Sequence, residues 1–216
     1  MTRLEFTTRI LKPLGFAAGL GPLVWLLWRG LVAGDLGADP VKTIQVTTGL
    51  ATLILLFCTL AVTPLRRLAR WSELIRLRRM LGLFAFFYVV LHAVTYFVFD
   101  QSLDPRLIWD DTVEHPRIAV GFAAFLLLVP LALTSTDGWV RRLGKRWGRL
   151  HRLVYPATAL GVLHLLMVQK LAFRVGLGYA AAFGILLAAR VLVARRRGAA
   201  PAAPAGPAAT SLPPAG

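Results

Sequence analysis

The sequence predicts an all-α fold: a polytopic integral membrane protein, built as a bundle of six transmembrane helices with the N- and C-termini both cytoplasmic. Three observations predict it. Of the 216 residues, 57% are hydrophobic and only 16% are charged, whereas soluble domains average about 25% charged residues. Six apolar windows approach the roughly 20 residues that a helix needs to cross the hydrocarbon core. The basic residues collect in alternate connections between these windows.

The predicted spans follow one another closely along the chain. They cover residues 13–34, 43–65, 80–99, 117–136, 153–169 and 175–194. Arg29 lies near the end of the first window and Arg190 near the end of the last. Long basic side chains at such positions can extend to the membrane interface, so both residues are compatible with spanning helices.

The formal net charge of +15 is distributed unevenly. With a cytoplasmic N-terminus and alternating spans, 19 of the 25 Lys and Arg residues fall on the cytoplasmic side, and seven of the ten acidic residues fall outside. Because the Lys and Arg bias of short loops sets the orientation of membrane proteins, this pattern predicts that both termini are cytoplasmic. It also accounts for the basic charge without a nucleic-acid partner.

One helical membrane domain, residues 1–197, is expected to be followed by a cytoplasmic tail. Residues 198–216 are rich in Pro and Ala and lack aromatic residues, which is typical of disorder. The outer segment 100–116 is acidic, contains Trp109, and is expected to be a loop that is either simply solvated or takes part in docking another protein. The single cysteine, Cys58, lies in the second predicted span and is expected to be a small buried apolar residue.

Two histidines lie deep within predicted spans, where an imidazole needs a partner. His92 follows Arg79, the last charge before the third span, by thirteen residues, and His164 follows Arg152 by twelve. At about 1.5 Å per residue, the two imidazoles lie roughly 20 Å and 18 Å from the cytoplasmic boundary. Both helices run outward, so both rings reach nearly one level, in the outer half of the membrane. Two neutral imidazoles at matched depth meet the requirement of a bis-histidine b-type haem.

The two histidines are also compatible with roles that involve no haem. Each could form a hydrogen bond with a backbone carbonyl or a neighbouring hydroxyl. A bare metal ion would require a third or fourth donor, and no carboxylate lies in any predicted span. The aromatic residues near His92 that could line a macrocycle, or simply pack, are Phe84, Phe86, Phe87, Tyr88, Tyr96, Phe97 and Phe99.

His151 is a third candidate, near the cytoplasmic boundary. It precedes His164 by thirteen residues, which places the two rings about 140° apart around an ideal helix. Pro156 lies between them and could rotate the helix by removing a backbone hydrogen bond. His151 could be a lone axial ligand, a proton or electron relay, or an interfacial residue. A second haem at its level would require a partner thirteen or fourteen residues before His92, where the sequence has Arg79 and Arg78.

On these residues the chain resembles the ferric-reductase-like transmembrane family over about residues 8–195. The resemblance is densest in "RRMLGLFAFFYVVLHAVTYFVFDQ" and in "LALTSTDGWVRRLGKRWGRLHRLVYPATALGVLHLL". More closely, the chain is similar to the haem-binding membrane subunits of bacterial periplasmic protein-methionine-sulfoxide reductase systems. The resemblance implies that His92, His164 and His151 are haem-associated and serve as axial ligands of haem iron. It implies haem b, leaves a second haem open, and adds FMN as a cofactor.

The resemblance also implies a place in an electron-transfer chain of the bacterial inner membrane. In that family the subunit itself is not the catalyst. It passes electrons from the quinone pool, through b haem and FMN, to a periplasmic molybdopterin-containing subunit that reduces methionine sulfoxide in oxidised envelope proteins. The sequence has no GxGxxG in a strand–helix context, so electrons are expected to enter from a lipid-soluble quinol or from a separate reductase.

Neither the FMN phosphate nor the haem propionates have a specific signature in the sequence. The basic residues that could hold the phosphate are Arg78, Arg79, Arg142, Lys145 and Arg149, although topology already accounts for them. Those that could pair with propionates near the outer rim are Arg106, Arg117 and Arg174. His115, beside Pro116 in the outer segment, is expected to be an ordinary surface residue.

Two further functions are compatible with the sequence. One is a haem-dependent ferric or cupric reductase that acts directly on an outer substrate. The other is a non-redox protein, such as a small membrane transporter, whose histidines only form hydrogen bonds. A b-type haem spectrum would separate the second alternative from the redox functions.

Overall fold

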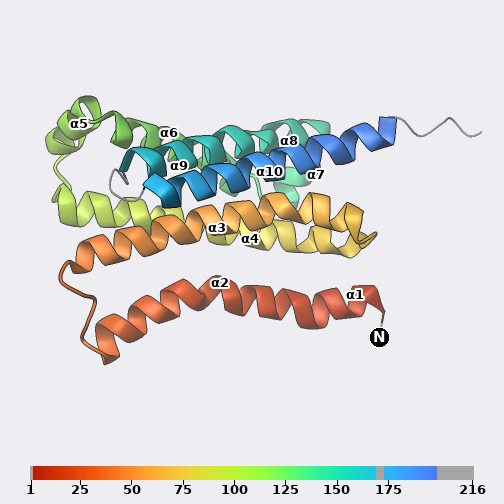
Figure 1. Ribbon diagram of the computed structural model, residues 1–216, viewed down its shortest axis with the longest axis horizontal. Helices are drawn as coiled ribbons and strands as arrows, with labels where there is room; N and C mark the ends of the chain where they lie inside the picture. The colour runs from red at the N-terminus through yellow and green to blue at the C-terminus, as the bar shows by residue number, and fades with distance from the viewer. Residues whose placement is uncertain (1, 169–172, 199–216) are drawn as a thin grey trace, which may run out of the picture.

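Six long helices make up most of the described part of the protein (Figure 1). The computed structural model describes residues 2–168 and 173–198. Within these residues, six helices are long and apolar enough to cross a membrane, as the sequence predicted. They are Arg3–Val32, Pro40–Leu68, Ser72–Asp100, Pro116–Leu133, Lys145–Val168 and Arg174–Leu192. Each overlaps its predicted window, and several extend beyond it because their polar ends continue the helix past the apolar stretch.

Short turns of other helical types subdivide some of these spans. The α-helices are α1 (Arg3–Phe6), α2 (Lys12–Leu27), α3 (Pro40–Leu68), α4 (Ile75–Thr95), α5 (Pro105–Glu114), α6 (Pro116–Leu133), α7 (Asp137–Leu143), α8 (Lys145–Leu150), α9 (Val154–Val168) and α10 (Phe173–Gly198). π-Helical turns occupy Thr7–Leu11, Trp28–Val32 and Tyr96–Asp100, and 3₁₀ turns occupy Ser72–Leu74 and His151–Leu153. The predicted tail lies outside the described residues except for Gly198, which ends α10.

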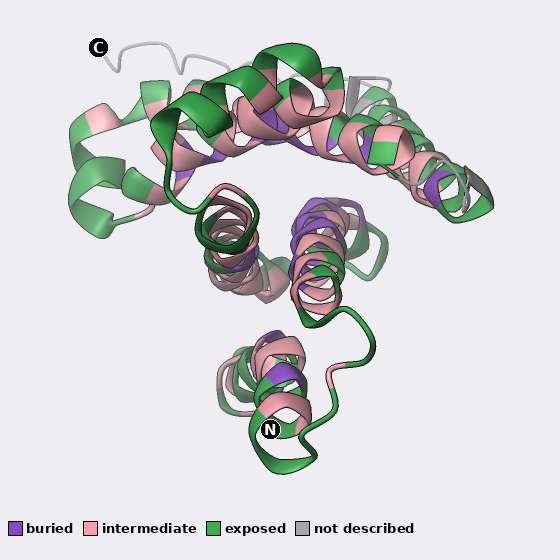
Figure 2. Cartoon of the chain, turned by 90° about the vertical axis from the view of Figure 1, so that its left-hand side faces the viewer, coloured by how far each residue is buried: buried purple, intermediate pink, exposed green. Residues whose placement is uncertain are grey.

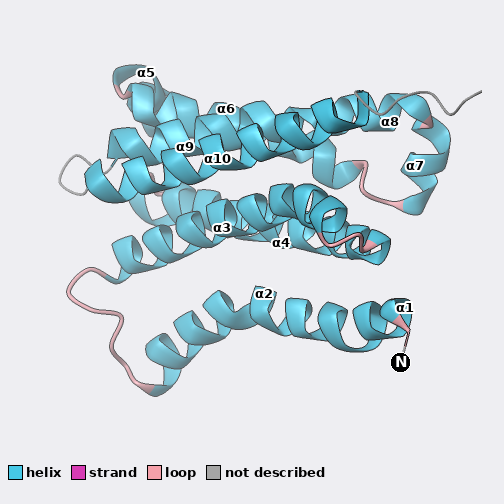
Figure 3. Ribbon diagram, turned by 45° about the vertical axis from the view of Figure 1, so that its right-hand side comes forward, coloured by secondary structure: helices cyan, strands magenta, loops and turns pink. Residues whose placement is uncertain are grey.

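The helices are arranged in three layers. Viewed along the bundle, α2 lies on one side, α3 and α4 lie in the middle, and α6, α9 and α10 form the opposite layer (Figure 2). Half of the most apolar window of α3 is buried, against 6–22% in the other five spans, so α3 is the central helix. Figure 3 shows that the described part of the chain contains helices and loops only.

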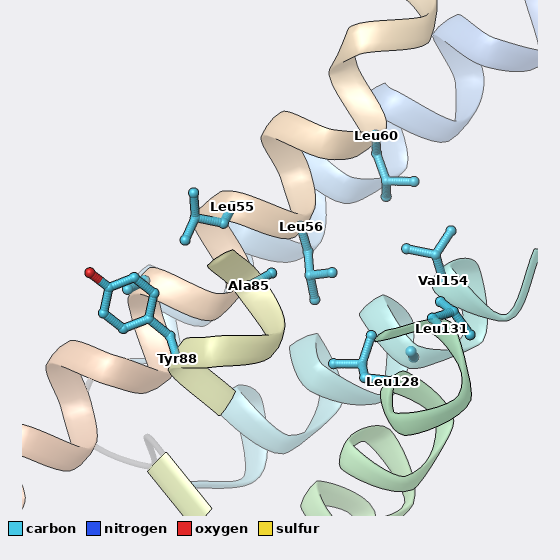
Figure 4. Packing of buried hydrophobic residues seen from close by; sticks show 10 residues of the cluster. Leu55, Leu56, Leu60, Ala85, Tyr88, Leu128, Leu131 and Val154 are labelled. Carbon is cyan, nitrogen blue, oxygen red and sulfur yellow. The ribbon is translucent and has the colours of Figure 1, made fainter. Parts of the chain in front are cut away.

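The core lies where α3, α4, α6 and α9 meet. Its buried side chains come from all four helices, and Figure 4 shows them converging. They are Ala51, Leu55, Leu56, Leu60, Ala85, Tyr88, Leu128, Leu131, Val154 and Ala157. Large apolar side chains elsewhere are exposed, for example Leu31 at 80% and Ile185 at 69%. This inverted distribution suits a protein whose outer surface contacts lipid.

The first span attaches to the bundle through two glycines of α2. An added Cβ at Gly15 would lie 2.8 Å from the Met80 side chain, and one at Gly19 would lie 2.7 Å from the ring of Phe84. Small residues four apart let helices approach closely in membranes. One turn further along α4, Tyr88 is fully buried.

Tyr88 holds this helix pair together with hydrogen bonds as well as with packing. Its hydroxyl donates to the carbonyl of Gly19 at 2.7 Å and accepts from the backbone N–H of Leu23 at 3.1 Å. In an α-helix these two backbone groups normally bond to each other. The tyrosine hydroxyl therefore enters the hydrogen-bond ladder of α2 beside Pro22, a position where helices are prone to bend.

A second proline is compensated by Arg190. Pro64 lies inside α3 and has no N–H, so it leaves the carbonyl of Leu60 without its helical partner. Arg190 donates to that carbonyl from Nε at 3.1 Å and from Nη2 at 2.8 Å, and it also bonds Thr63 and the hydroxyl of Tyr155. The sequence was compatible with an Arg190 side chain that extends to the membrane interface. Instead, its guanidinium turns inward and joins α10 to α3 and α9.

The two ends of the bundle differ in character. We call the end that carries α5 the α5 end, and the opposite end, which carries α7 and α8, the α7–α8 end. The first described residues and the last turns of α10 both lie at the α7–α8 end (Figure 1). The segment that the sequence suggested to be a loop folds into α5, with Asp104 accepting from the N–H of Arg106 at 2.8 Å and Pro105 in the first turn.

The side chains of two further residues lie differently from what the sequence predicted. Cys58 is exposed on α3 rather than buried, because it lies on the side of this helix away from the core. Arg29 does not extend freely: it donates to the backbone and the carboxylate of Asp35 at 2.8 and 3.1 Å. The N–H of Gly37 and the Arg29 guanidinium hold the pKa of Asp35 below its ordinary value.

Candidate functional site

A cavity of about 390 Å³ lies between α3, α4, α6 and α9 and reaches the α5 end. This volume falls in the range of ligand sites, which are mostly apolar with a few placed polar groups. Its walls are mainly apolar, with Leu53, Leu56, Phe122 and Phe125 among them. Polar groups collect toward α5. The cavity therefore has the lining expected of a site that holds a cofactor.

His92 from α4 and His164 from α9 face each other across this cavity. Their ring centres are 6.1 Å apart, and their planes are inclined at 83°. The two residues are 72 positions apart in the chain, so only the packing of α4 against α3 and of α9 against α6 brings them together. The juxtaposition expected from matched depths is observed, and the role of the two rings as ligands stays a prediction.

Each ring is oriented by one backbone hydrogen bond from a neighbouring helix. His92 Nδ1 lies 3.0 Å from the carbonyl oxygen of Gln45 in α3, and His164 Nδ1 lies 2.7 Å from that of Arg117 in α6. A carbonyl can only accept, so Nδ1 carries the proton in both neutral rings. The lone pair is then on Nε2.

These hydrogen bonds leave one nitrogen of each ring available as a ligand. The histidines do bond backbone carbonyls, as one of the sequence-based alternatives expected, but only through Nδ1. Within the part of the chain that the structure describes, neither Nε2 of the pair takes part in a hydrogen bond. A neutral imidazole with Nδ1–H bound to a carbonyl is the usual form of a metal-ligating histidine, because the bond fixes the tautomer and strengthens the donor.

The rim of the cavity at the α5 end is acidic and strongly hydrogen-bonded. Asp111 of α5 accepts from the hydroxyl of Tyr96 and from the side-chain amide of Gln101, both at 2.8 Å. His115 Nδ1 lies 2.8 Å from the other oxygen of Asp111, and the side chain of this histidine is 39% exposed. The side-chain amide of Gln45 donates to Asp100. These bonds fix α5 over one side of the opening.

His151 lies elsewhere in the bundle and does not line the cavity. It occupies the 3₁₀ turn between α8 and α9, so the change of helical register occurs at this turn and not at Pro156, which sits in the first turn of α9. The ring stacks on Trp147 at 3.8 Å, and Nδ1 lies 3.2 Å from the carbonyl oxygen of Trp147. Its Nε2 is buried and has no partner among the described residues.

The aromatic and basic residues predicted near the haem divide into those that line the cavity and those that do not. Of the aromatic residues near His92, only Tyr96 and Phe97 line it, and α6 contributes Phe122 and Phe125. Of the three arginines considered for propionates, only Arg117 lines it, and Arg106 and Arg174 do not.

The basic residues considered for a phosphate lie toward the α7–α8 end. Arg79 forms an ion pair with Asp137 at 2.6 Å, and Arg142 lies over the ring of Trp139 at 5.6 Å. These two of the five are therefore already engaged within the chain. Arg78, Lys145 and Arg149 are the other three.

Comparison with known proteins places the chain in a family. Residues 48–162 match the family described as "Ferric reductase like transmembrane component". This segment contains His92 and His151 and ends two residues before His164. It also contains most of the cavity wall.

Curated relatives extend the similarity over most of the chain. The chain is 52% identical over 190 residues to a protein of Rhodospirillum rubrum, covering 86% of this chain and 91% of the relative. It is 47% identical to one of Xanthomonas axonopodis pv. citri, covering 83% and 85%, and 54% identical to one of Herminiimonas arsenicoxydans, covering 72% and 71%. All three are called "Protein-methionine-sulfoxide reductase heme-binding subunit MsrQ".

Proposed function

Because this chain belongs to the ferric-reductase-like transmembrane family and, within it, to the MsrQ group, we propose that it is a membrane electron-transfer subunit with b-type haem held between His92 and His164. Its relatives are named as haem-binding subunits of protein-methionine-sulfoxide reductase. The observation that carries the proposal is the pair of imidazoles that face each other across the cavity, each with Nδ1 bonded to a carbonyl.

The geometry of the pair suits one iron between two nitrogen donors. Their ring centres are 6.1 Å apart, which would leave room for a metal ion about 2 Å from one nitrogen of each ring. The apolar walls of the cavity would contact the macrocycle and exclude water, and Arg117 at the rim would pair with a propionate. A haem held by these residues would supply reversible one-electron transfer.

We place the α5 end on the periplasmic side and the α7–α8 end, with both termini, in the cytoplasm. The basic residues of the cytoplasmic connections support this orientation through the positive-inside bias. The haem cavity then lies in the periplasmic half, close to the surface where a periplasmic partner would dock. We propose that the membrane is the bacterial inner membrane.

The proposed partner is a periplasmic, molybdopterin-containing catalytic subunit that reduces methionine sulfoxide in oxidised proteins. Each sulfoxide takes up two electrons and two protons and yields methionine and one water. This chain would supply only the electrons, received from a quinol or from a separate reductase. The reaction of the partner consumes two electrons, so this chain would have to deliver them in two successive one-electron transfers.

His151 is proposed as a ligand or relay of a second redox group nearer the cytoplasm. Its buried Nε2, without a partner among the described residues, supports this role. FMN, which the family resemblance implies, would find basic groups at the same end, with Arg78, Lys145 and Arg149 as candidates for its phosphate. The number of haems and the presence of flavin are both decided by a cofactor count per chain.

The first prediction concerns the haem ligands. We expect the purified, reduced protein to show the Soret and α bands of b-type haem, and His92→Ala or His164→Ala to abolish the six-coordinate spectrum, because each change removes one axial nitrogen. His115→Ala serves as the matched control: it removes an imidazole that lies close to Asp111 but does not line the cavity, and it should keep the spectrum. A normal six-coordinate spectrum in both ligand variants would contradict the proposal.

The same preparations separate the electron-transfer function from direct metal reduction. Haem and flavin are counted per chain in the parent protein and in His151→Ala. Methionine-sulfoxide reduction is then measured with the catalytic partner in the presence and absence of this chain. A requirement for both proteins supports the proposed function. Reduction of ferric or cupric ions by this chain alone would instead favour a direct metal reductase.

A further inference from the structure

The two histidines of the cavity are held by the same arrangement of a backbone carbonyl and a glycine. In each case Nδ1 bonds the carbonyl of a residue 47 positions earlier, on the helix packed alongside: Gln45 for His92 and Arg117 for His164. In each case a glycine follows the carbonyl residue by four positions, Gly49 in α3 and Gly121 in α6.

The position of each glycine has a physical reason. In an α-helix the side chain of residue i+4 leans toward the N-terminus and covers the turn that contains the carbonyl of residue i. A ring from a neighbouring helix can reach that carbonyl only if residue i+4 leaves the space open. Gly49 and Gly121 are the residues that would otherwise cover the carbonyls of Gln45 and Arg117.

The contact distances show how closely the rings fill these spaces. A Cβ added at Gly121 would lie 2.9 Å from Nδ1 and 3.0 Å from Cε1 of His164. A Cβ added at Gly49 would lie 3.3 Å from the same two atoms of His92. Both distances are below ordinary van der Waals contact. The imidazoles therefore rest directly on glycine backbone, and the space at Gly121 is the tighter one.

We propose that Gly49 and Gly121 are positioning residues that fix the angle and the hydrogen bonds of the two axial imidazoles, and thereby set the potential of the haem. This inference rests on the proposed function, since it concerns how the haem ligands are held. It assigns a role in haem binding to two residues that have no polar side chain.

The consequence for the haem follows from the carbonyl bonds. A hydrogen bond from Nδ1 to a carbonyl increases the electron donation of Nε2, and stronger donation stabilises ferric iron and lowers the reduction potential. A methyl group at position 121 would push the ring of His164 away from the Arg117 carbonyl and lengthen its 2.7 Å bond. The potential should then rise. The inclination of the two ring planes, now 83°, should change with it.

The experiment compares three Gly→Ala variants of the full-length protein in detergent. Gly121→Ala and Gly49→Ala test the proposal, and Gly82→Ala in α4 is the matched control, because its added Cβ would meet only Thr59 at 4.0 Å. Haem content, midpoint potential and the electron paramagnetic resonance of the ferric protein are measured for each. Axial imidazoles at nearly right angles give a low-spin signal with a large maximum g value, which reports directly on ring orientation.

We expect Gly121→Ala to raise the midpoint potential of the haem and to lower the maximum g value. Gly49→Ala should change both quantities in the same direction to a smaller extent. Gly82→Ala should have the same midpoint potential and g value as the parent protein. If Gly121→Ala does not fold, the midpoint potential and g values of Gly49→Ala test the proposal, because the added Cβ at position 49 would lie farther from its histidine ring. Parental potential and g values in every folded glycine variant would overturn the proposal, while His92→Ala and His164→Ala would still lose the haem. Retention of six-coordinate haem in those two histidine variants would instead overturn the proposed function.

Discussion

At the scale of single residues, hydrogen bonds to backbone groups decide where polar side chains lie in this bundle. His92, His164 and Arg190 each bond a carbonyl of another helix, and Tyr88 bonds both a carbonyl and an N–H. In an apolar environment an unpaired polar group is costly, so each of these side chains must have a specific acceptor or donor. A substitution that removes one of these side chains should therefore remove a hydrogen bond between two helices.

Tyr88→Phe tests this at the most buried position. The change removes the hydroxyl between Gly19 and Leu23 and leaves a carbonyl and an N–H without this partner. We expect a loss of about 1–3 kcal/mol in the free energy of unfolding, measured as a lower thermal midpoint in detergent, with the haem spectrum unchanged. Tyr179→Phe, at a half-buried ring beside Phe57, is the control and should have a smaller effect. Equal midpoints for parent and Tyr88→Phe would contradict the prediction.

At the scale of helices, prolines and glycines determine how the spans join. Pro64 exposes the carbonyl of Leu60, and Arg190 of α10 binds it. Gly15 and Gly19 let α2 approach α4. Proline and glycine both weaken an isolated helix, but here they form contacts between helices. The proline frees a backbone carbonyl for Arg190, and the glycines make room for side chains of the neighbouring helix.

The pairing of Pro64 with Arg190 can be tested by a double-mutant cycle. Arg190→Ala should cost about 1.5–3 kcal/mol of stability, as expected for hydrogen bonds from a charged group. In a Pro64→Ala background the new N–H satisfies the carbonyl of Leu60, so the same arginine change should cost less. Chemical or thermal unfolding in detergent measures both values, with the exposed Arg195→Ala as the control. Additive effects would show that the two residues are not coupled.

At the scale of the whole molecule, the charge of the connections predicts one orientation. The cavity and the acidic rim lie at the α5 end, and both termini of the described chain lie at the α7–α8 end (Figure 1). Placing the α5 end in the periplasm brings the two facing imidazoles near the side on which the catalytic partner would act.

Cysteine labelling tests this orientation. Cys58 is the single cysteine, so Cys58→Ala gives a background without thiols. Asp110→Cys in α5 and Arg141→Cys in α7 then place one thiol at each end, both at exposed positions. In intact spheroplasts a membrane-impermeant maleimide should label the first variant only, and after lysis it should label both. Labelling of Arg141→Cys before lysis would reverse the proposed orientation.

Much of this architecture could be predicted from sequence, and two local features could not. Hydropathy located all six spans, and the helical rise predicted that His92 and His164 reach one level. The burial of Cys58 was predicted wrongly, because a cysteine in a span is equally free to face lipid. The segment 100–116 was not recognised as containing a helix, although Asp104 followed by Pro105 is a helix-start signal.

Sequence alone determined the number of spans, the uneven charge of the connections and the depth of the two histidines, because these depend on composition and on a constant rise per residue. Tertiary structure decided which carbonyl each ring binds, which glycines make room for it, and where Arg190 turns. These features depend on the rotation of each helix about its own axis and on neighbours far away in the chain. Neither hydropathy nor helical rise contains that information.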